Sequence, residues 1–191
     1  MPKQASEGSK RAILDATLAS LIEQGAGGVT IDRVAKRAGV AKGLVNYHFQ
    51  TKDRLLAAAV EVLSRRRQAR WTEAFSALDL NSVVDDTWRL IRTEQGEGVL
   101  RATISLYGET GQHLRTAVHQ ATAGFAKLVA QGVEQLLHRA GARSRVPADQ
   151  LGWLVAAVID GAQLQLGSGV SAEIVENAYA AAWLGVLGLA A

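Results

Sequence analysis

The residues best able to do chemistry lie between Thr30 and Lys52, where hydrogen-bond donors are frequent and Asp32 is the single acid. Lysine can donate to guanine O6 or N7, and asparagine can pair with adenine N6 and N7. A glycine allows the backbone to approach a base edge, while a tyrosine hydroxyl or a helix N-terminus can bind phosphate. We therefore expect this segment to bind double-stranded DNA through the following residues: Thr30, Arg33, Lys42, Gly43, Asn46, Tyr47 and Lys52.

Residues 42–49 must form a helix with two distinct faces if these donors are to reach DNA. At about 100° per residue, Val45, His48 and Phe49 fall on one side. The four candidate DNA contacts of this helix fall on the other side. The first face is predicted to pack in the core, so His48 is expected to be a packed histidine and not a base reader.

The pattern of apolar residues predicts an all-α fold of about nine helices. Apolar side chains recur at three- and four-residue spacing, and the chain has only two prolines. Thr30 is suited to cap the second helix, and Gly39 to end it. The expected helices cover approximately residues 9–24, 31–38, 42–49, 52–75, 82–94, 98–107, 113–140, 147–166 and 172–189.

Charge is distributed unevenly along the chain. Residues 1–70 contain 13 Lys and Arg against 6 Asp and Glu, whereas residues 71–191 contain 8 against 12. A basic N-terminal part suggests that it meets a polyanion, although a solvated basic face would have the same composition. The cluster from Arg65 to Arg70 is interpreted as such a solvated face. The chain begins without an apolar segment, which favours a cytoplasmic protein.

Residues from about Arg11 to Leu63 resemble the DNA-binding domain of the TetR family of bacterial transcription regulators. The resemblance rests on residue types at the family's spacing, namely Thr30, Val34, Ala35, Ala38, Gly39, Val40, Gly43, Val45, His48, Phe49, Thr51, Lys52 and Leu55. Three positions depart from the family pattern. Ala41 stands where Ser or Thr usually caps the next helix, Leu44 where Thr is frequent, and Asn46 where Tyr is frequent.

The resemblance implies two domains. Residues 7–65 would form a three-helix helix-turn-helix domain with its motif at about 30–49, and residues 66–191 a helical effector-binding and dimerisation domain. In this family the last two helices form a four-helix bundle with those of a second copy. The last helix here is apolar nearly all round, which calls for cover on both sides. We expect a homodimer whose interface includes Gly152, Ala156, Gly161, Ala178, Ala182 and Gly185.

A homodimer would present two reading helices to a palindromic operator, with half-sites about 34 Å or more apart. A small-molecule effector in the C-terminal domain could change that separation through the helix at 52–75. The effector itself is unknown, and core packing is the alternative explanation for each residue that could line its pocket. Those candidates are Trp88, Tyr107, His119, Phe125, Trp153 and Gln163.

Other classes of function find little support in the sequence. There is no phosphate loop, no H-E-x-x-H and no nucleophile elbow, so no catalytic residues and no enzyme are predicted. The absence of cysteine and the scattered histidines favour neither a metal site nor a cofactor. The apolar stretch 151–169 is interrupted by Asp160, and 178–191 is shorter than the roughly 20 residues of a membrane span, so no membrane association is expected.

The sequence therefore predicts a homodimeric repressor that a small molecule releases from its operator. An activator or dual regulator of the same family is an open alternative. A third alternative, from another class, is a helical small-molecule carrier that does not bind DNA.

Overall fold

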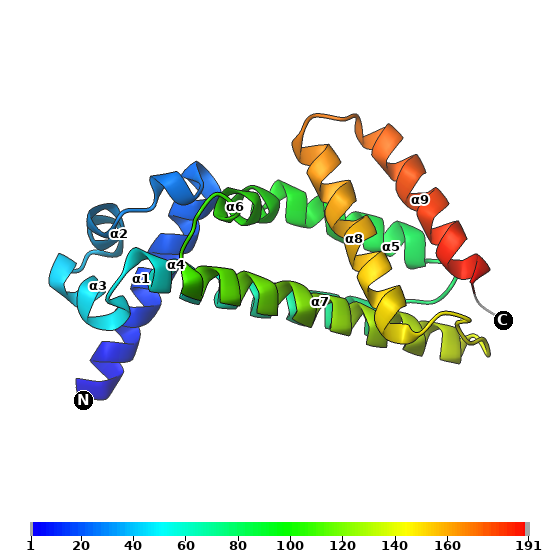
Figure 1. Ribbon diagram of the computed structural model, residues 1–191, viewed down its shortest axis with the longest axis horizontal. Helices are drawn as coiled ribbons and strands as arrows, with labels where there is room; N and C mark the ends of the chain where they lie inside the picture. Colours follow the sequence, from blue (N-terminus) through cyan, green and yellow to red (C-terminus); the bar gives the residue numbers. More distant parts are fainter. Residues whose placement is uncertain (1, 190–191) are drawn as a thin grey trace. The chain divides into compact units, whose positions relative to one another are not determined.

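A computed structural model describes residues 2–189, with side chains described for 6–99 and 101–189. Nine α-helices, one short 3-10 helix and no strand make up this part of the chain (Figure 1), which confirms the predicted all-α fold. The helices are α1 (Pro2–Gln24), η1 (Ala26–Gly28), α2 (Ile31–Ala38), α3 (Lys42–Phe49), α4 (Lys52–Ala77), α5 (Val83–Gly96), α6 (Val99–Leu106), α7 (Gln112–Arg139), α8 (Ala148–Gly167) and α9 (Ala172–Gly188).

The chain divides into two compact units. The first contains the chain up to Ser64 together with Arg101–Ala121, and the second contains the rest. The division passes through α4 and α7, so both helices contribute to both units. The domains expected from the sequence are 7–65 and 66–191, which place residues 101–121 in the C-terminal domain. The structure groups these residues with the first unit.

The first unit has one apolar core to which six α-helices and η1 contribute. Ile13 and Leu21 of α1 lie in it together with Val34 of α2 and Val45 of α3, and Figure 1 shows these three helices gathered beside the N-terminus. The same core contains residues of α4, α6 and α7, namely Leu55, Leu56, Ala59, Ala102, Leu106, Leu114 and Ala117. Burial of apolar surface therefore attaches α6 and the start of α7 to the first unit.

Caps and turns fix the ends of the short helices. The Thr30 hydroxyl accepts a hydrogen bond from the N–H of Arg33 at 3.2 Å, as expected for the cap of α2. Gly39 ends α2 with φ 68°, the left-handed conformation that favours glycine. Ala41 precedes α3 without a side-chain cap, in agreement with the departure noted in the sequence.

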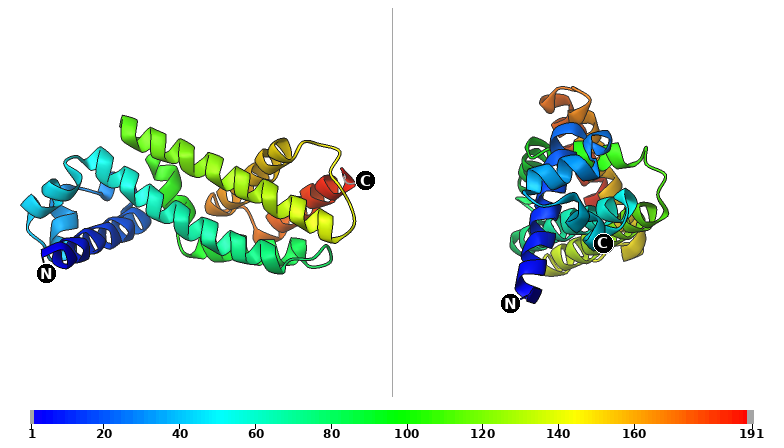
Figure 2. Two further views of the ribbon diagram at one scale, coloured as in Figure 1. Left: turned by 90° about the horizontal axis from the view of Figure 1, so that it is seen from below. Right: turned by 90° about the vertical axis from the view of Figure 1, so that its left-hand side faces the viewer.

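The second unit is built around aromatic side chains. Trp71, Phe75, Phe125, Tyr179 and Trp183 are all buried in its core. Helix α8 packs against α5 and α9, and α9 also packs against α5 (Figure 2). Within the described residues, no helix is both long enough and apolar enough to span a membrane.

The start of α1 and the place of Pro147 differ from the sequence prediction. Helix α1 begins at Pro2, well before Ser9, because the polar residues at its start form further turns that the apolar stripe did not reveal. Pro147 is the N-cap of α8 and precedes its first helical residue.

Candidate nucleic-acid interface

Helix α3 presents the two faces that its sequence predicts. Val45 and Phe49 are buried with 0% and 4% of their surface exposed, whereas Tyr47 is 75% exposed. Lys42, Gly43 and Asn46 are also exposed. The buried pair anchors the helix to the first unit and leaves the other side open to a ligand.

His48 is half-buried, and its Nε2 is buried without a hydrogen-bond partner. Its ring lies edge-on to Tyr47, with 5.2 Å between ring centroids. His48 thus lies at the edge of the buried face of α3, in contact with the Tyr47 ring.

The two lysines of the candidate interface are each held by a carboxylate. Lys42 Nζ lies 2.8 Å from Oδ1 and 3.1 Å from Oδ2 of Asp32, which stands in the first turn of α2. Lys52 Nζ lies 2.9 Å from Oε1 of Glu109, in the connection between α6 and α7. The sequence analysis paired neither lysine with an acid. Asp32 lies ten positions before Lys42 on the preceding helix, and no local pattern links Lys52 to a residue 57 positions away.

Arg33 and Thr30 have structural duties in addition to their expected contact with phosphate. The Arg33 guanidinium donates to the Gln24 side chain at 2.9 Å and to the Gly28 carbonyl at 3.3 Å. It thereby ties α2 to the end of α1. Both residues are exposed, so the remaining donors of Arg33 and the N-terminus of α2 stay accessible.

Asp53 joins the start of α4 to the start of α7. Its carboxylate accepts hydrogen bonds from the N–H groups of His113 and Leu114 at 3.1 and 3.0 Å, and His113 Nδ1 lies 2.8 Å away. Burial raises the pKa of Asp53, but the hydrogen bonds from Leu114 and His113 outweigh it and the pKa is lowered. A charged Asp53 thus caps α7 from a neighbouring helix.

A second tie links α6 to the end of α1. The Ser105 hydroxyl accepts a hydrogen bond from the N–H of Ala26 at 2.9 Å and donates to the Ala102 carbonyl at 2.7 Å. Gly25 stands at φ 69°, and a Cβ there would meet Ser105 Cβ at 3.0 Å. With the Asp53 cap, this contact fixes residues 101–121 to the unit that carries α3.

The six residues predicted to line an effector pocket are not gathered in one place. Trp88, Phe125 and Gln163 are buried in the second unit, whereas Trp153 is 48% exposed there. Tyr107 and His119 are exposed and belong to the first unit. The two buried aromatic residues pack against other aromatic rings, Trp88 against Tyr179 and Phe125 against Trp71. This is the core packing that was the alternative to a role in an effector pocket.

A buried polar network surrounds Glu94, which is only 1% exposed. Its carboxylate accepts hydrogen bonds from Trp71 Nε1 at 2.9 Å and Gln163 Nε2 at 2.5 Å. Arg67 Nε lies 3.3 Å from the same carboxylate, and another Arg67 nitrogen lies 2.7 Å from Asp160. The Arg67 guanidinium also covers the Phe125 ring at 3.7 Å. Arg67 is thus a structural residue of the second unit and not part of a solvated basic face.

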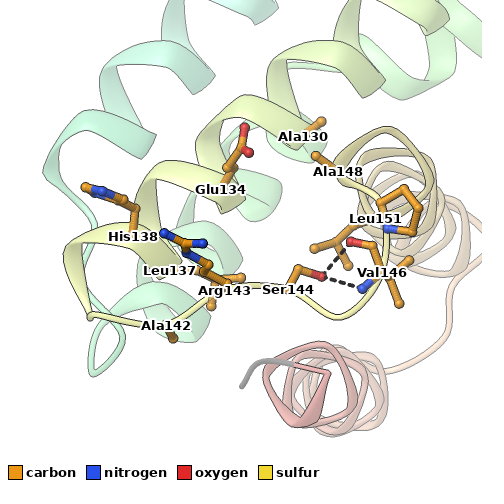
Figure 3. A pocket seen from close by; sticks show the side chains of 11 residues that line it. Ala130, Glu134, Leu137, His138, Ala142, Arg143, Ser144, Val146, Ala148 and Leu151 are labelled. Carbon is orange, nitrogen blue, oxygen red and sulfur yellow. Dashed lines mark hydrogen bonds between the residues drawn. The ribbon is translucent and has the colours of Figure 1, made fainter.

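A pocket of about 490 Å³ lies where α7 is connected to α8. Figure 3 shows Glu134 and His138 projecting from α7, Leu151 from α8, and Arg143 from the connecting loop. The Ser144 hydroxyl accepts from the Val146 N–H and donates to its carbonyl, which holds this loop in shape. None of the six predicted effector residues lines this pocket.

The small residues predicted at a dimer interface fall into two groups. Gly152 and Ala156 are buried, and a Cβ at Gly152 would collide with the Ala126 carbonyl of α7. Within one chain these two residues therefore pack inside the second unit, and their place in a dimer interface stays a prediction. The other four, Gly161, Ala178, Ala182 and Gly185, are wholly or partly exposed.

Groups of His, Cys, Asp and Glu able to hold a metal ion are not found among the described residues.

The helix-turn-helix geometry of α2 and α3 agrees with two sequence relationships. The family model "Bacterial regulatory proteins, tetR family" matches residues 13–59. The HTH-type transcriptional regulator BetI of Paraburkholderia xenovorans is 30% identical over an alignment of 177 residues that covers 86% of this chain and 85% of that protein.

This chain belongs to the TetR family of bacterial transcriptional regulators. BetI of Escherichia coli is 25% identical over an alignment of 173 residues that covers 86% of each chain. The fold is shared with a TetR-family structure from Mesorhizobium loti, with a TM-score of 0.80 and 17% identity over 97% of this chain and 98% of that one. Reduced NemR of E. coli gives a TM-score of 0.75 with 20% identity over 96% and 97%. As a member of the TetR family, the protein is a DNA-binding transcriptional regulator.

Proposed function

We propose that this TetR-family regulator is a homodimeric repressor that binds a palindromic operator and leaves it when a small-molecule effector binds. The observation that supports DNA binding is the exposed face of α3. Lys42, Gly43 and Asn46 lie on this face, and Val45 and Phe49 lie buried on the opposite face. A helix anchored on one side and rich in donors on the other suits the major groove. The protein would act in the cytoplasm by binding and not by catalysis.

Exposed apolar side chains on α8 and α9 support the homodimer. Trp153, Leu154 and Leu164 of α8 are 46–52% exposed, and Ile174 and Leu184 of α9 are 62% and 69% exposed. Large apolar side chains gathered on two adjacent helices indicate an interaction surface. A second copy would cover these side chains and bring Gly161, Ala178, Ala182 and Gly185 into close helix contact.

The continuity of α4 and α7 across the two units supports an effector-dependent repressor. An effector that prefers one arrangement of the second unit would change the spacing of two α3 helices in a dimer through these shared helices. The pocket beside α7 and α8 has a volume within the range of small-molecule sites, and we propose that the effector binds in the second unit.

Operator selection tests the proposal most directly. The purified protein would be incubated with fragmented genomic DNA, and the bound fragments sequenced. We expect a recurring palindrome, bound by one or two dimers and at least about 10³-fold more tightly than random DNA. Equal affinity for selected and random duplexes would refute sequence-specific regulation. Sedimentation of the free protein as a monomer at binding concentrations would refute the dimer.

A further inference from the structure

Two carboxylates lie where bound DNA would bring negative charge. Asp32 holds Lys42 through both of its oxygens, and Glu109 holds Lys52. The Asp32 and Lys42 side chains are 71% and 58% exposed, whereas Glu109 and Lys52 are 30% and 36% exposed. Both lysines are candidate DNA contacts, so the inference rests on the DNA binding proposed above. Each acid must be considered together with the lysine that it holds.

A carboxylate beside Lys42 affects contacts with bases and with phosphates differently. An ammonium has three N–H donors, so Lys42 can donate to guanine O6 or N7 while keeping its ion pair with Asp32. The guanine edge carries acceptors but no net charge. A phosphate carries a full negative charge, and its contact with Lys42 would place two anions within a few ångströms of each other. Asp32 therefore disfavours contact with the backbone more than contact with a base.

We propose that Asp32 is a specificity-determining residue, which makes Lys42 favour a guanine edge over a phosphate and so weakens binding to non-operator DNA. Glu109 has a different effect because Lys52, at the start of α4, is expected to contact phosphate in every duplex. It restrains Lys52 equally on operator and non-operator DNA. Asp32 thus sets the ratio of the two affinities, and Glu109 lowers both.

The dependence of affinity on salt follows from the same ion pairs. Each phosphate neutralised by a lysine releases about 0.9 of a counterion from duplex DNA. When the lysine leaves a carboxylate to reach the phosphate, that carboxylate recruits a cation from solution, and the net release is smaller. Removing either acid should therefore steepen the slope of log affinity against log salt by up to about one on random DNA.

The experiment compares D32N and E109Q in the full-length protein, using the selected operator and a random-sequence duplex over a range of salt concentrations. D32N should bind the random duplex about three- to tenfold more tightly and the operator with less gain, so that the affinity ratio falls. E109Q should tighten binding to both duplexes by a similar factor and leave the ratio of the two affinities unchanged. D149N is the matched control, because Asp149 is an exposed first-turn aspartate of α8 in the second unit, and we expect neither slope nor ratio to change.

A double-mutant cycle separates the proposed role from an effect on folding. In a K42A background, D32N should no longer alter affinity for the random duplex, while circular dichroism and thermal unfolding should remain close to those of K42A. The proposal is overturned if D32N leaves the affinity ratio unchanged, lowers both affinities, or acts equally without Lys42. A wild-type protein that shows no preference for any duplex would instead refute the proposed function, while the salt slopes on random DNA would still report on the acids.

Discussion

Replacing Gly43 by alanine should separate the stability of the protein from its binding to DNA. A Cβ at Gly43 would meet no atom within 4 Å, and the residue has no left-handed φ that would strain alanine. Alanine is favoured over glycine inside a helix by about 0.5–1 kcal/mol, and the lower value applies here because Gly43 is the second residue of α3. We therefore expect the melting temperature to rise by about 1–2 °C.

The same methyl group should weaken operator binding. If the backbone at Gly43 lies against a base edge or a thymine methyl, one added carbon overpacks the contact, at about 1–3 kcal/mol, or roughly 5- to 150-fold in affinity. Fluorescence anisotropy with the selected operator measures the loss, and differential scanning calorimetry measures the stability. Gly8→Ala is the matched control, since Gly8 is also helical and exposed with open space at its Cβ; it should stabilise without weakening DNA binding. Full operator affinity in Gly43→Ala would show that the α3 backbone does not approach the bases.

Four further substitutions test other parts of the molecule. Asn46→Ala should relax specificity at one base pair, with a loss of about 1–3 kcal/mol on the operator and almost none on operators altered at that pair. Asp53→Asn should weaken the cap on α7 by about 1 kcal/mol in urea unfolding. Because the folded pKa of Asp53 is lowered, this stability is present above its unfolded pKa of about 3.9 and is lost as pH falls through the folded value, so the two proteins should converge in acid. Glu94→Ala should destabilise the second unit by about 3–5 kcal/mol in thermal unfolding, because it leaves the buried donors of Trp71 and Gln163 without their acceptor; an unchanged melting temperature would contradict the network. Leu184→Glu should produce monomers in sedimentation velocity by placing a charge in the proposed interface, and a persistent dimer would place that interface elsewhere.

Local features of the sequence were sufficient to predict the helices and the two faces of α3. Thr30 and Gly39 act within a few residues of themselves, through a cap and a left-handed turn, so their roles can be deduced from neighbours alone. The burial of Val45 and Phe49 follows in the same way from helical periodicity. The DNA contacts that this face implies stay a prediction until binding is measured.

Contacts between distant parts of the chain were beyond the reach of local patterns. Asp53 accepts a hydrogen bond from the N–H of His113, 60 residues later in the first turn of α7. An aspartate in a first turn also has an adequate local explanation in the dipole of its own helix. Arg67 likewise fits a solvated basic cluster until Glu94 and Asp160 are brought beside it. Gly152 follows the small-residue pattern of an interface, but only its distance to α7 reveals that the close approach is within the chain. Each of these three residues has a role that its sequence neighbours explain adequately. Its contact with a distant part of the chain is visible only in the folded structure.

The division of the chain bears on how an effector signal would reach α3. The unit that carries α3 also includes α6 and the start of α7, fixed by the Asp53 cap and the Ser105 hydrogen bonds. Helix α4 crosses the division without a glycine or proline, so it lacks the usual sites of a kink and should transmit displacement as a rod. Helix α7 crosses the division after Ala121, three residues before Gly124. A helix bends more easily at a glycine such as Gly124. We therefore expect an effector to move α3 together with α6 and the first turns of α7, and not to move the helix-turn-helix alone.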